Sequence, residues 1–171
     1  CLRLARSKTQ RNHFLSSGYH GYQDWFALAW PNNGIPTDLH KYSHAIEYGD
    51  LDAVDKVFET VGSDLAAVIV SPVEWHQEPS VAFLEKLRSK CDEYGSVLIF
   101  DEVLTGFRLA KGGAAEHFGV TPDLAAYAKG IANGYPLSAY AGKADYMDAL
   151  DRTIITTTYA GDTLSLAAAK A

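Results

Sequence analysis

Residues 97–100 (VLIF) form an uninterrupted apolar run that ends directly before two carboxylate residues, and residues 65–70 (LAAVIV) form a second run. Short apolar runs without alternating polar residues are typical of strands covered on both faces, as in a parallel sheet. Residues 124–128 (LAAYA) and 137–141 (LSAYA) are weaker strand candidates of the same kind. The four runs together predict a mostly parallel sheet.

Helical patterns alternate with these runs. Residues 50–61 and residues 81–94 place their apolar side chains three and four positions apart, the spacing of an amphipathic helix. Asp50 or Asp52 is placed to cap the first helix, and Gly95 is placed to end the second. Strands and helices in this order predict right-handed crossovers and a three-layer α/β/α fold.

The composition is that of a soluble globular domain and argues against several kinds of partner. The chain has 171 residues, of which 47% are hydrophobic and 21% are charged. Its 15 Lys and Arg against 21 Asp and Glu give a net charge of −6, which disfavours nucleic acid and anionic membranes as partners. Two cysteines are too few for a disulfide framework, and no apolar run is long enough to span a membrane. We expect a reduced, cytoplasmic location.

The two ends of the sequence indicate that the chain continues beyond them. Residues 1–6 have the pattern of a helix already under way. Residues 164–171 form a helical run without a Gly or Asn cap. We therefore expect an internal part of a longer protein.

Chemistry is expected at the carboxyl ends of the strands, where open α/β sheets bind their ligands. Asp101 and Glu102 directly follow the first apolar run, and a carboxylate there could hold a metal, act as a base, pair with a protonated nitrogen, or only cap a turn. Lys129 follows the run at 124–128. The interval between Asp101 and Lys129 fits one helical crossover over residues 105–123, which would bring both side chains to one edge.

Lys129 differs in its surroundings from an ordinary surface lysine. Small and apolar residues precede it, and Gly130, Asn133 and Gly134 follow it. We expect burial at the strand end, which lowers the pKa of a lysine below its free value of about 10.4. A lysine of this kind is what Schiff-base chemistry requires.

Two further segments are candidates for ligand contacts. Tyr19, His20 and Gly21 follow an apolar stretch at a strand exit, where an aromatic ring can stack on a planar ligand. Residues 30–48 are predicted to be a long loop, and long loops are often functional.

Polar clusters in the predicted loops carry less information. Glu74, His76 and Glu78 alternate between two prolines, and substrate contacts are one interpretation of them. His40 and His44 have a spacing that could hold zinc on a helix, but the composition around them disfavours a helix. No metal site is predicted.

Three of these segments, taken in order, resemble a known family. They are IFDEVLTGFR at residues 99–108, GVTPDL at 119–124 and AKG at 128–130. They are similar to the class III aminotransferases, which are pyridoxal-phosphate enzymes of fold type I. The sequence of the first segment is most similar to the corresponding segment of glutamate-1-semialdehyde aminomutase and its relatives. The resemblance extends from residues 2–6 to residues 158–161.

The resemblance implies a role for each strand-end residue. Lys129 would form the aldimine with the cofactor aldehyde and then move the proton between substrate and cofactor. Asp101 would pair with the pyridine nitrogen and keep it protonated, so that the ring accepts electrons. Tyr19 would stack on one face of the ring, and Val103 would pack on the other.

Further roles follow from the same resemblance. His20 and Gly21 would shape the loop under the ring, and Thr158 resembles the threonine that reaches across a homodimer to the cofactor phosphate. The phosphate loop of the family would precede Cys1 and is absent, as is the small C-terminal domain. Residues 1–171 would then be the central part of the large cofactor-binding domain. Ser71 stands where many members have glutamate, which affects the substrate side of the site.

We interpret the chain as part of a pyridoxal-phosphate-dependent transaminase that moves an amino group from an amino donor to a carbonyl acceptor in a homodimer. Intramolecular transfer by an aminomutase uses the same motifs and is the alternative. A more distant alternative is a P-loop nucleotide hydrolase in which Asp101 and Glu102 hold Mg²⁺, and another is an inactive domain. The 171 residues alone are expected to be inactive.

Overall fold

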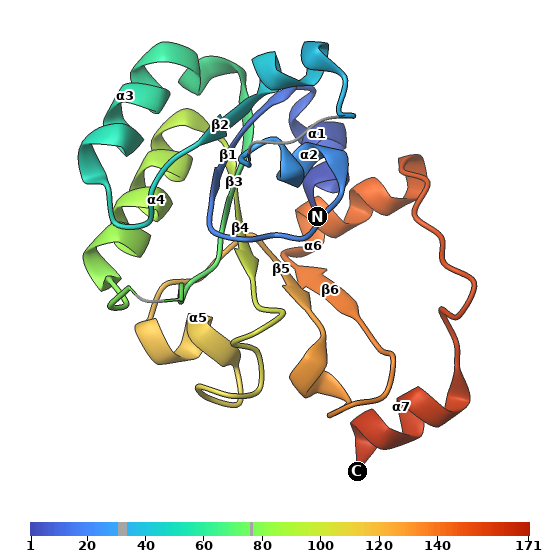
Figure 1. The fold of residues 1–171 in the computed structure, drawn as a ribbon. Coiled ribbons are helices and arrows are strands. Elements are labelled where there is room, and N and C mark those ends of the chain that lie inside the picture. The colour runs from blue at the N-terminus through green and yellow to red at the C-terminus, as the bar shows by residue number, and fades with distance from the viewer. Residues whose placement is uncertain (31–33, 76) are drawn as a thin grey trace.

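The computed structural model describes residues 1–30, 34–75 and 77–171, and within them six strands form one sheet in the order β2-β1-β3-β4-β5-β6 (Figure 1). The first five strands in this order pair in parallel, and β6 pairs antiparallel with β5. This arrangement confirms the predicted mostly parallel sheet. The strands are β1 (His13–Ser17), β2 (Ser43–Ala45), β3 (Leu65–Val70), β4 (Val97–Asp101), β5 (Leu124–Tyr127) and β6 (Ala139–Gly142).

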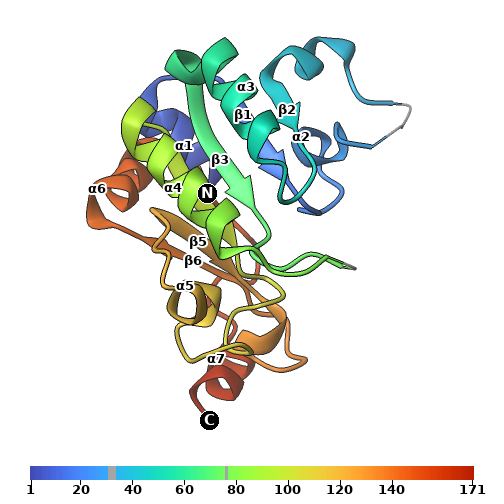
Figure 2. The same ribbon diagram turned by 90° about the vertical axis from the view of Figure 1, so that its left-hand side faces the viewer.

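Helices cover both faces of the sheet and complete a three-layer fold. Helices α3 and α4 pack on one face, while α1 and the segment around α6 pack on the other (Figure 2). The α-helices are α1 (Leu2–Thr9), α2 (Asp24–Ala27), α3 (Leu51–Val61), α4 (Val81–Tyr94), α5 (Gly113–Phe118), α6 (Ala144–Met147) and α7 (Thr163–Lys170). Four short 3-10 helices in the described residues are η1 (Thr37–Tyr42), η2 (Gly62–Asp64), η3 (Lys129–Ile131) and η4 (Asp148–Arg152).

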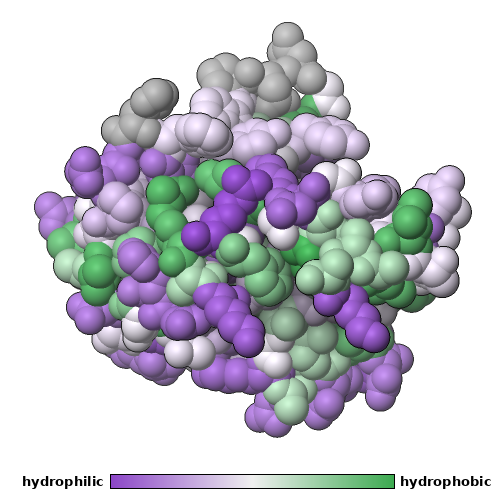
Figure 3. Space-filling view, turned by 90° about the horizontal axis from the view of Figure 1, so that it is seen from below, coloured by the Kyte–Doolittle hydropathy of each residue, from purple (hydrophilic) through white to green (hydrophobic). Residues whose placement is uncertain are grey.

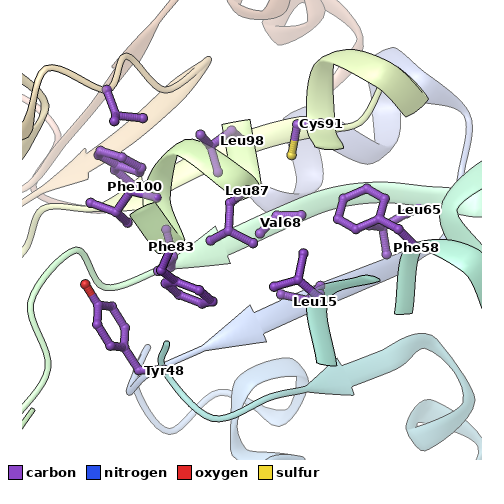
Figure 4. Packing of buried hydrophobic residues seen from close by; sticks show 14 of the residues in the cluster. Leu15, Tyr48, Phe58, Leu65, Val68, Phe83, Leu87, Cys91, Leu98 and Phe100 are labelled. Carbon is purple, nitrogen blue, oxygen red and sulfur yellow. The ribbon is translucent and has the colours of Figure 1, made fainter. Parts of the chain in front are cut away.

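The apolar strands divide their side chains between two cores. Val68, Leu98 and Phe100 face α3 and α4, where Phe58 and Phe83 are fully buried (Figure 4). The alternate strand residues, among them Ile69 and Ile99, face α1. Because both faces are apolar, the strands have no alternating pattern in the sequence, as the prediction assumed.

The two long predicted helices are confirmed together with their ends. The Asp50 side chain accepts a hydrogen bond from the Ala53 amide at 2.9 Å and caps α3. Ser80 caps α4 in the same way through the Phe83 amide. Gly95 ends α4 in a left-handed conformation (φ 67°), which costs a glycine no steric clash.

Two predictions about connections were wrong in part. Only α5 is α-helical in the crossover 105–123, because glycines at 106 and 112 interrupt the segment before it. The segment 30–48, predicted as one loop, contains η1 and the edge strand β2. That strand has the sequence SHA, which offers no apolar run to detect. Residues 31–33 of the segment lie outside the described residues.

The C-terminal segment lies apart from the helices that cover the sheet. Figure 1 shows α7 at the end of an extended connection, and Figure 3 views the molecule from the side on which α5 and α7 lie, with hydrophobic and hydrophilic side chains intermixed. Leu164 and Leu166 on α7 are exposed. Among the described helices, none has both the length and the apolar character needed to cross a membrane.

Removal of a core ring tests the packing of α4 on the sheet. We expect Phe83→Ala to lower the free energy of unfolding by about 3–5 kcal/mol, because it opens a cavity between α4 and the sheet. Val81→Ala on the exposed side of the same helix should change it by no more than about 0.5 kcal/mol. Denaturant unfolding of both variants measures the difference, and equal losses would contradict the packing described for Phe83.

Candidate active site

A cavity of about 170 Å³ lies at the carboxyl ends of the parallel strands. The connections that follow β1, β3, β4 and β5 all contribute side chains to it, as the strand-end rule predicts. Its lining residues are Tyr19, His20, Gly21, Ser71, Val73, Glu74, Trp75, Asp101, Val103, Leu104, Thr105 and Lys129. Six of the seven residues predicted for the site are therefore brought together.

Asp101 is held in place by two hydrogen bonds from different elements. Its Oδ2 lies 2.8 Å from Nδ1 of His20, and its Oδ1 accepts the Val103 amide at 3.1 Å. The side chain is 13% exposed, so the carboxylate borders the cavity while its partner His20 is almost completely buried. The carboxylate is thus fixed in direction and still open to a ligand.

The His20 ring is held by contacts at both of its nitrogens. Nε2 lies 3.1 Å from the carbonyl oxygen of Ser17, which can only accept, so Nε2 bears a proton. On the other side of the ring, Nδ1 lies 2.8 Å from the Asp101 carboxylate. The ring therefore orients Asp101 and cannot itself turn toward the cavity without losing both bonds.

Glu102, the neighbour of Asp101, has a purely structural environment. It is fully buried, and its carboxylate accepts hydrogen bonds from the amides of Ala114 (2.9 Å) and Ala115 (3.0 Å) and from the Thr105 hydroxyl. The carboxylate thereby fixes the start of α5 against the end of β4. Of the roles considered for the two carboxylates, the turn and cap role belongs to Glu102.

Lys129 lies at the rim of the cavity, directly after β5, and is exposed. The expectation that it is buried was wrong, because Lys129 begins η3 instead of continuing β5 and its side chain is exposed. Its backbone has φ 43°, in the left-handed region that costs a residue with a Cβ atom about 1–3 kcal/mol. Gly130 follows because a Cβ there would lie 2.9 Å from the carbonyl oxygen of Gly106.

The Tyr19 loop is tied to the connection after β3. The Tyr19 amide donates to Glu74 Oε1 at 3.3 Å, and the Ser71 hydroxyl donates to the Tyr19 carbonyl oxygen at 3.5 Å. Gly18 (φ 103°) permits this approach, since a Cβ there would lie 2.1 Å from Glu74 Oε1. The Tyr19 side chain is 56% exposed, so its ring is available for a ligand contact.

Some lining residues were missed or given little weight in the sequence. Trp75 had no assigned role, although a tryptophan between two prolines after a buried strand was a signal for the edge of the site. Glu74 lines the cavity, whereas Glu78 does not, and His76 lies outside the described residues.

Thr158 and the two histidines considered as zinc ligands lie elsewhere. Thr158 is exposed in the connection to α7 and does not line the cavity. His44, in β2, lies 2.9 Å from a nitrogen of His13, and His40 lies in η1. Within the described ranges, no group of three or more His, Cys, Asp or Glu side chains could hold a metal ion.

Comparison with known proteins decides the family. The family model for aminotransferase class-III matches residues 2–171, which is almost the entire chain. The chain belongs to the class III aminotransferases. Membership confirms the family resemblance seen in the sequence, and it leaves the nucleotide-hydrolase alternative without support, since Glu102 is also engaged in structural bonds.

Two proteins similar to this chain are named as an aminotransferase and a transaminase. The chain is 37% identical over 164 residues to a 3-aminobutyryl-CoA aminotransferase of Cloacimonas acidaminovorans (strain Evry), with 92% of this chain and 39% of that protein covered. An omega-transaminase from Sphaerobacter thermophilus has a TM-score of 0.91 at 28% identity, with 98% of this chain and 44% of that chain covered.

A third similar protein is described with its cofactor attached. The FumI protein of a Sphingopyxis species, in its PLP internal aldimine form, has a TM-score of 0.90 at 31% identity, with 99% of this chain and 42% of that chain covered. The chain thus spans about two fifths of the length of the relatives it matches.

The structural role of Glu102 is testable by truncation. Glu102→Ala leaves two amides and a hydroxyl without their acceptor, and a buried group without a partner costs about 1–3 kcal/mol. We expect the free energy of unfolding to fall by about 3 kcal/mol or more. The exposed Glu85→Ala is the control in denaturant unfolding, and equal midpoints for the two variants would contradict the assignment.

Proposed function

We propose that the chain forms part of a pyridoxal-phosphate-dependent transaminase, which transfers an amino group from an amino donor to a carbonyl acceptor. The observation that carries this proposal is the presence of Asp101, Lys129 and Tyr19 around one cavity. Family membership and the aminotransferase names of similar proteins support it.

The residues present fit pyridoxal phosphate in their chemistry. A fixed carboxylate suits a protonated ring nitrogen, a lysine amine suits an aldehyde, and an exposed aromatic ring suits stacking on a planar ring. The cavity of about 170 Å³ is smaller than a typical ligand pocket of roughly 300–1,000 Å³. Among its described lining residues Lys129 is the only Lys or Arg, so the phosphate group needs further contacts.

Pyridoxal phosphate, when bound, supplies an aldehyde that reacts with amines and a ring that withdraws electrons from the substrate carbon. We assign Asp101 to hold a proton at the ring nitrogen through its carboxylate. His20 is a positioning residue, because its bonds to Ser17 and Asp101 fix the carboxylate. Tyr19 and Val103 are assigned to the two faces of the ring, with Gly21 in the loop beside it.

Lys129 is assigned two tasks at its Nζ atom. It would hold the cofactor aldehyde while no substrate is present, and as a free amine it would take up and return the proton of the substrate carbon. Such proton transfer requires a group within hydrogen-bond reach of the proton that moves. Lys129 is exposed at the rim of the cavity, and a further surface over it would exclude water from the transfer.

A second copy of the chain is the covering surface that we propose, in a cytoplasmic homodimer. Large apolar side chains are exposed in the connection to α7, with Ile154 at 82% and Tyr159 at 78% exposure. Exposed apolar groups in one segment are typical of interaction surfaces. Thr158 lies between them, which supports its assignment to the phosphate of the partner's cofactor.

Covalent trapping tests the role of Lys129. Borohydride treatment of the cofactor-loaded full-length protein should fix a pyridoxyl group on Lys129, identified by peptide mass spectrometry. Lys129→Ala should abolish this label and lower the rate of amino transfer by about two to four orders of magnitude. Lys111→Ala, an exposed lysine outside the cavity, should keep both. A label that persists in Lys129→Ala would show that another amine binds the aldehyde.

The need for an acceptor separates transfer between two molecules from the aminomutase alternative. We expect amine consumption by the protein to stop when no carbonyl acceptor is supplied, and to resume with one equivalent of acceptor consumed per amine. Turnover of an amino aldehyde without any acceptor would favour the aminomutase reaction. If the cofactor-loaded protein consumes no amine either with or without an acceptor, the inactive-domain alternative is favoured.

A further inference from the structure

A second cavity, of about 680 Å³, adjoins the candidate active site. The two cavities share Tyr19, Glu74 and Trp75, so these three side chains border both of them. The second volume lies within the range of roughly 300–1,000 Å³ typical of ligand pockets. Its other lining residues are Ser16, Gly18, Ala29, Trp30, Ala45, Ile46, Glu47, Tyr48 and Gln77.

The lining of this cavity has a distinct chemistry. Tyr19, Trp30 and Trp75 are each more than half exposed, which presents aromatic rings at its surface. Glu47 and Glu74 are the charged residues among its described lining, which contains no Lys, Arg or His. Aromatic faces and carboxylates both attract cations, and no cationic side chain in this lining would neutralise them.

Glu74 lies on the boundary that the two cavities share. Its carboxylate is half-buried and fixed by the Tyr19 amide, while Gly18 leaves the space that it fills. Its negative charge also adds to the rise in the pKa of Tyr48, which is due first to burial. The charge of Glu74 therefore acts on the second cavity as well as on the first.

We propose that the second cavity binds the far ammonium group of a diamine donor whose near amine reacts at Lys129. This inference rests on the proposed function, and it names a substrate class for it. Glu74 would pair with the far ammonium group, Trp75 and Tyr19 would offer their ring faces, and Glu47 would add to the negative potential. A donor with a carboxylate at its far end would meet two like charges and is disfavoured.

Three amines of equal chain length test the preference. Cadaverine, pentylamine and δ-aminovalerate carry a cationic, a neutral and an anionic far end. We expect kcat/KM of the cofactor-loaded full-length protein to follow that order, with cadaverine favoured over pentylamine by about three- to tenfold, as for ion pairs and cation–π contacts at partly exposed groups. Equal values for cadaverine and pentylamine would overturn the proposal.

Matched variants assign the preference to the cavity. Glu74→Gln and Glu47→Gln should each lower the ratio of kcat/KM for cadaverine over pentylamine. Glu78→Gln, on the same connection as Glu74 but outside both cavities, should leave the ratio unchanged. A ratio that persists in Glu74→Gln would place the selective group elsewhere and reject the proposal.

A binding measurement separates this inference from the proposed function. Calorimetric titration of cadaverine into Lys129→Ala needs no turnover, and binding should weaken when Glu74→Gln is added. If no amine is turned over yet cadaverine binds in this way, the transaminase proposal is contradicted and the diamine site in the second cavity is supported. If amines are turned over without preference and cadaverine binds no better than pentylamine, the diamine site is contradicted and the transaminase proposal is supported.

Discussion

Parallel pairing of β1, β3, β4 and β5 is the constraint on which the candidate site depends. The register sets Ser17 beside Val70, Val70 beside Phe100, and Asp101 beside Ala126. Four strands therefore end at nearly the same level, and the residues that follow them meet at one edge. The pairing is stabilised by apolar side chains on both faces, so the position of the polar groups is set by the burial of the apolar ones.

Asp101 and Glu102 show how adjacent residues of one type acquire different tasks. The chain turns sharply after β4, which leaves one carboxylate at the cavity and carries the other into the protein. The buried carboxylate ties α5 to the strand end, and the other keeps an opening toward a ligand. At the end of β1, Ser17 is likewise buried and contributes its carbonyl group, while Tyr19, two residues later, offers an exposed ring.

Most of the sheet and the two long helices could be predicted because their signals are local. Runs such as LAAVIV and capping residues such as Asp50 are read directly from neighbouring positions. Asp101 and Lys129 were found by the rule that ligands bind at strand ends. The walls contributed by Glu74 and Trp75 depend on how three separate connections approach one another, which no single segment of sequence encodes. The edge strand β2 is too short to leave a pattern, and the small and apolar residues before Lys129 gave no sign that its side chain is exposed.

The left-handed backbone at Lys129 has a consequence for evolution and engineering. Glycine adopts this conformation without steric penalty, and asparagine tolerates it better than lysine does. Selection for thermal stability alone would therefore replace the lysine at this position, whereas its amine is the group assigned to the chemistry. Stability and activity oppose each other at this one residue, so a library screened only for heat resistance would accumulate folded, inert variants there.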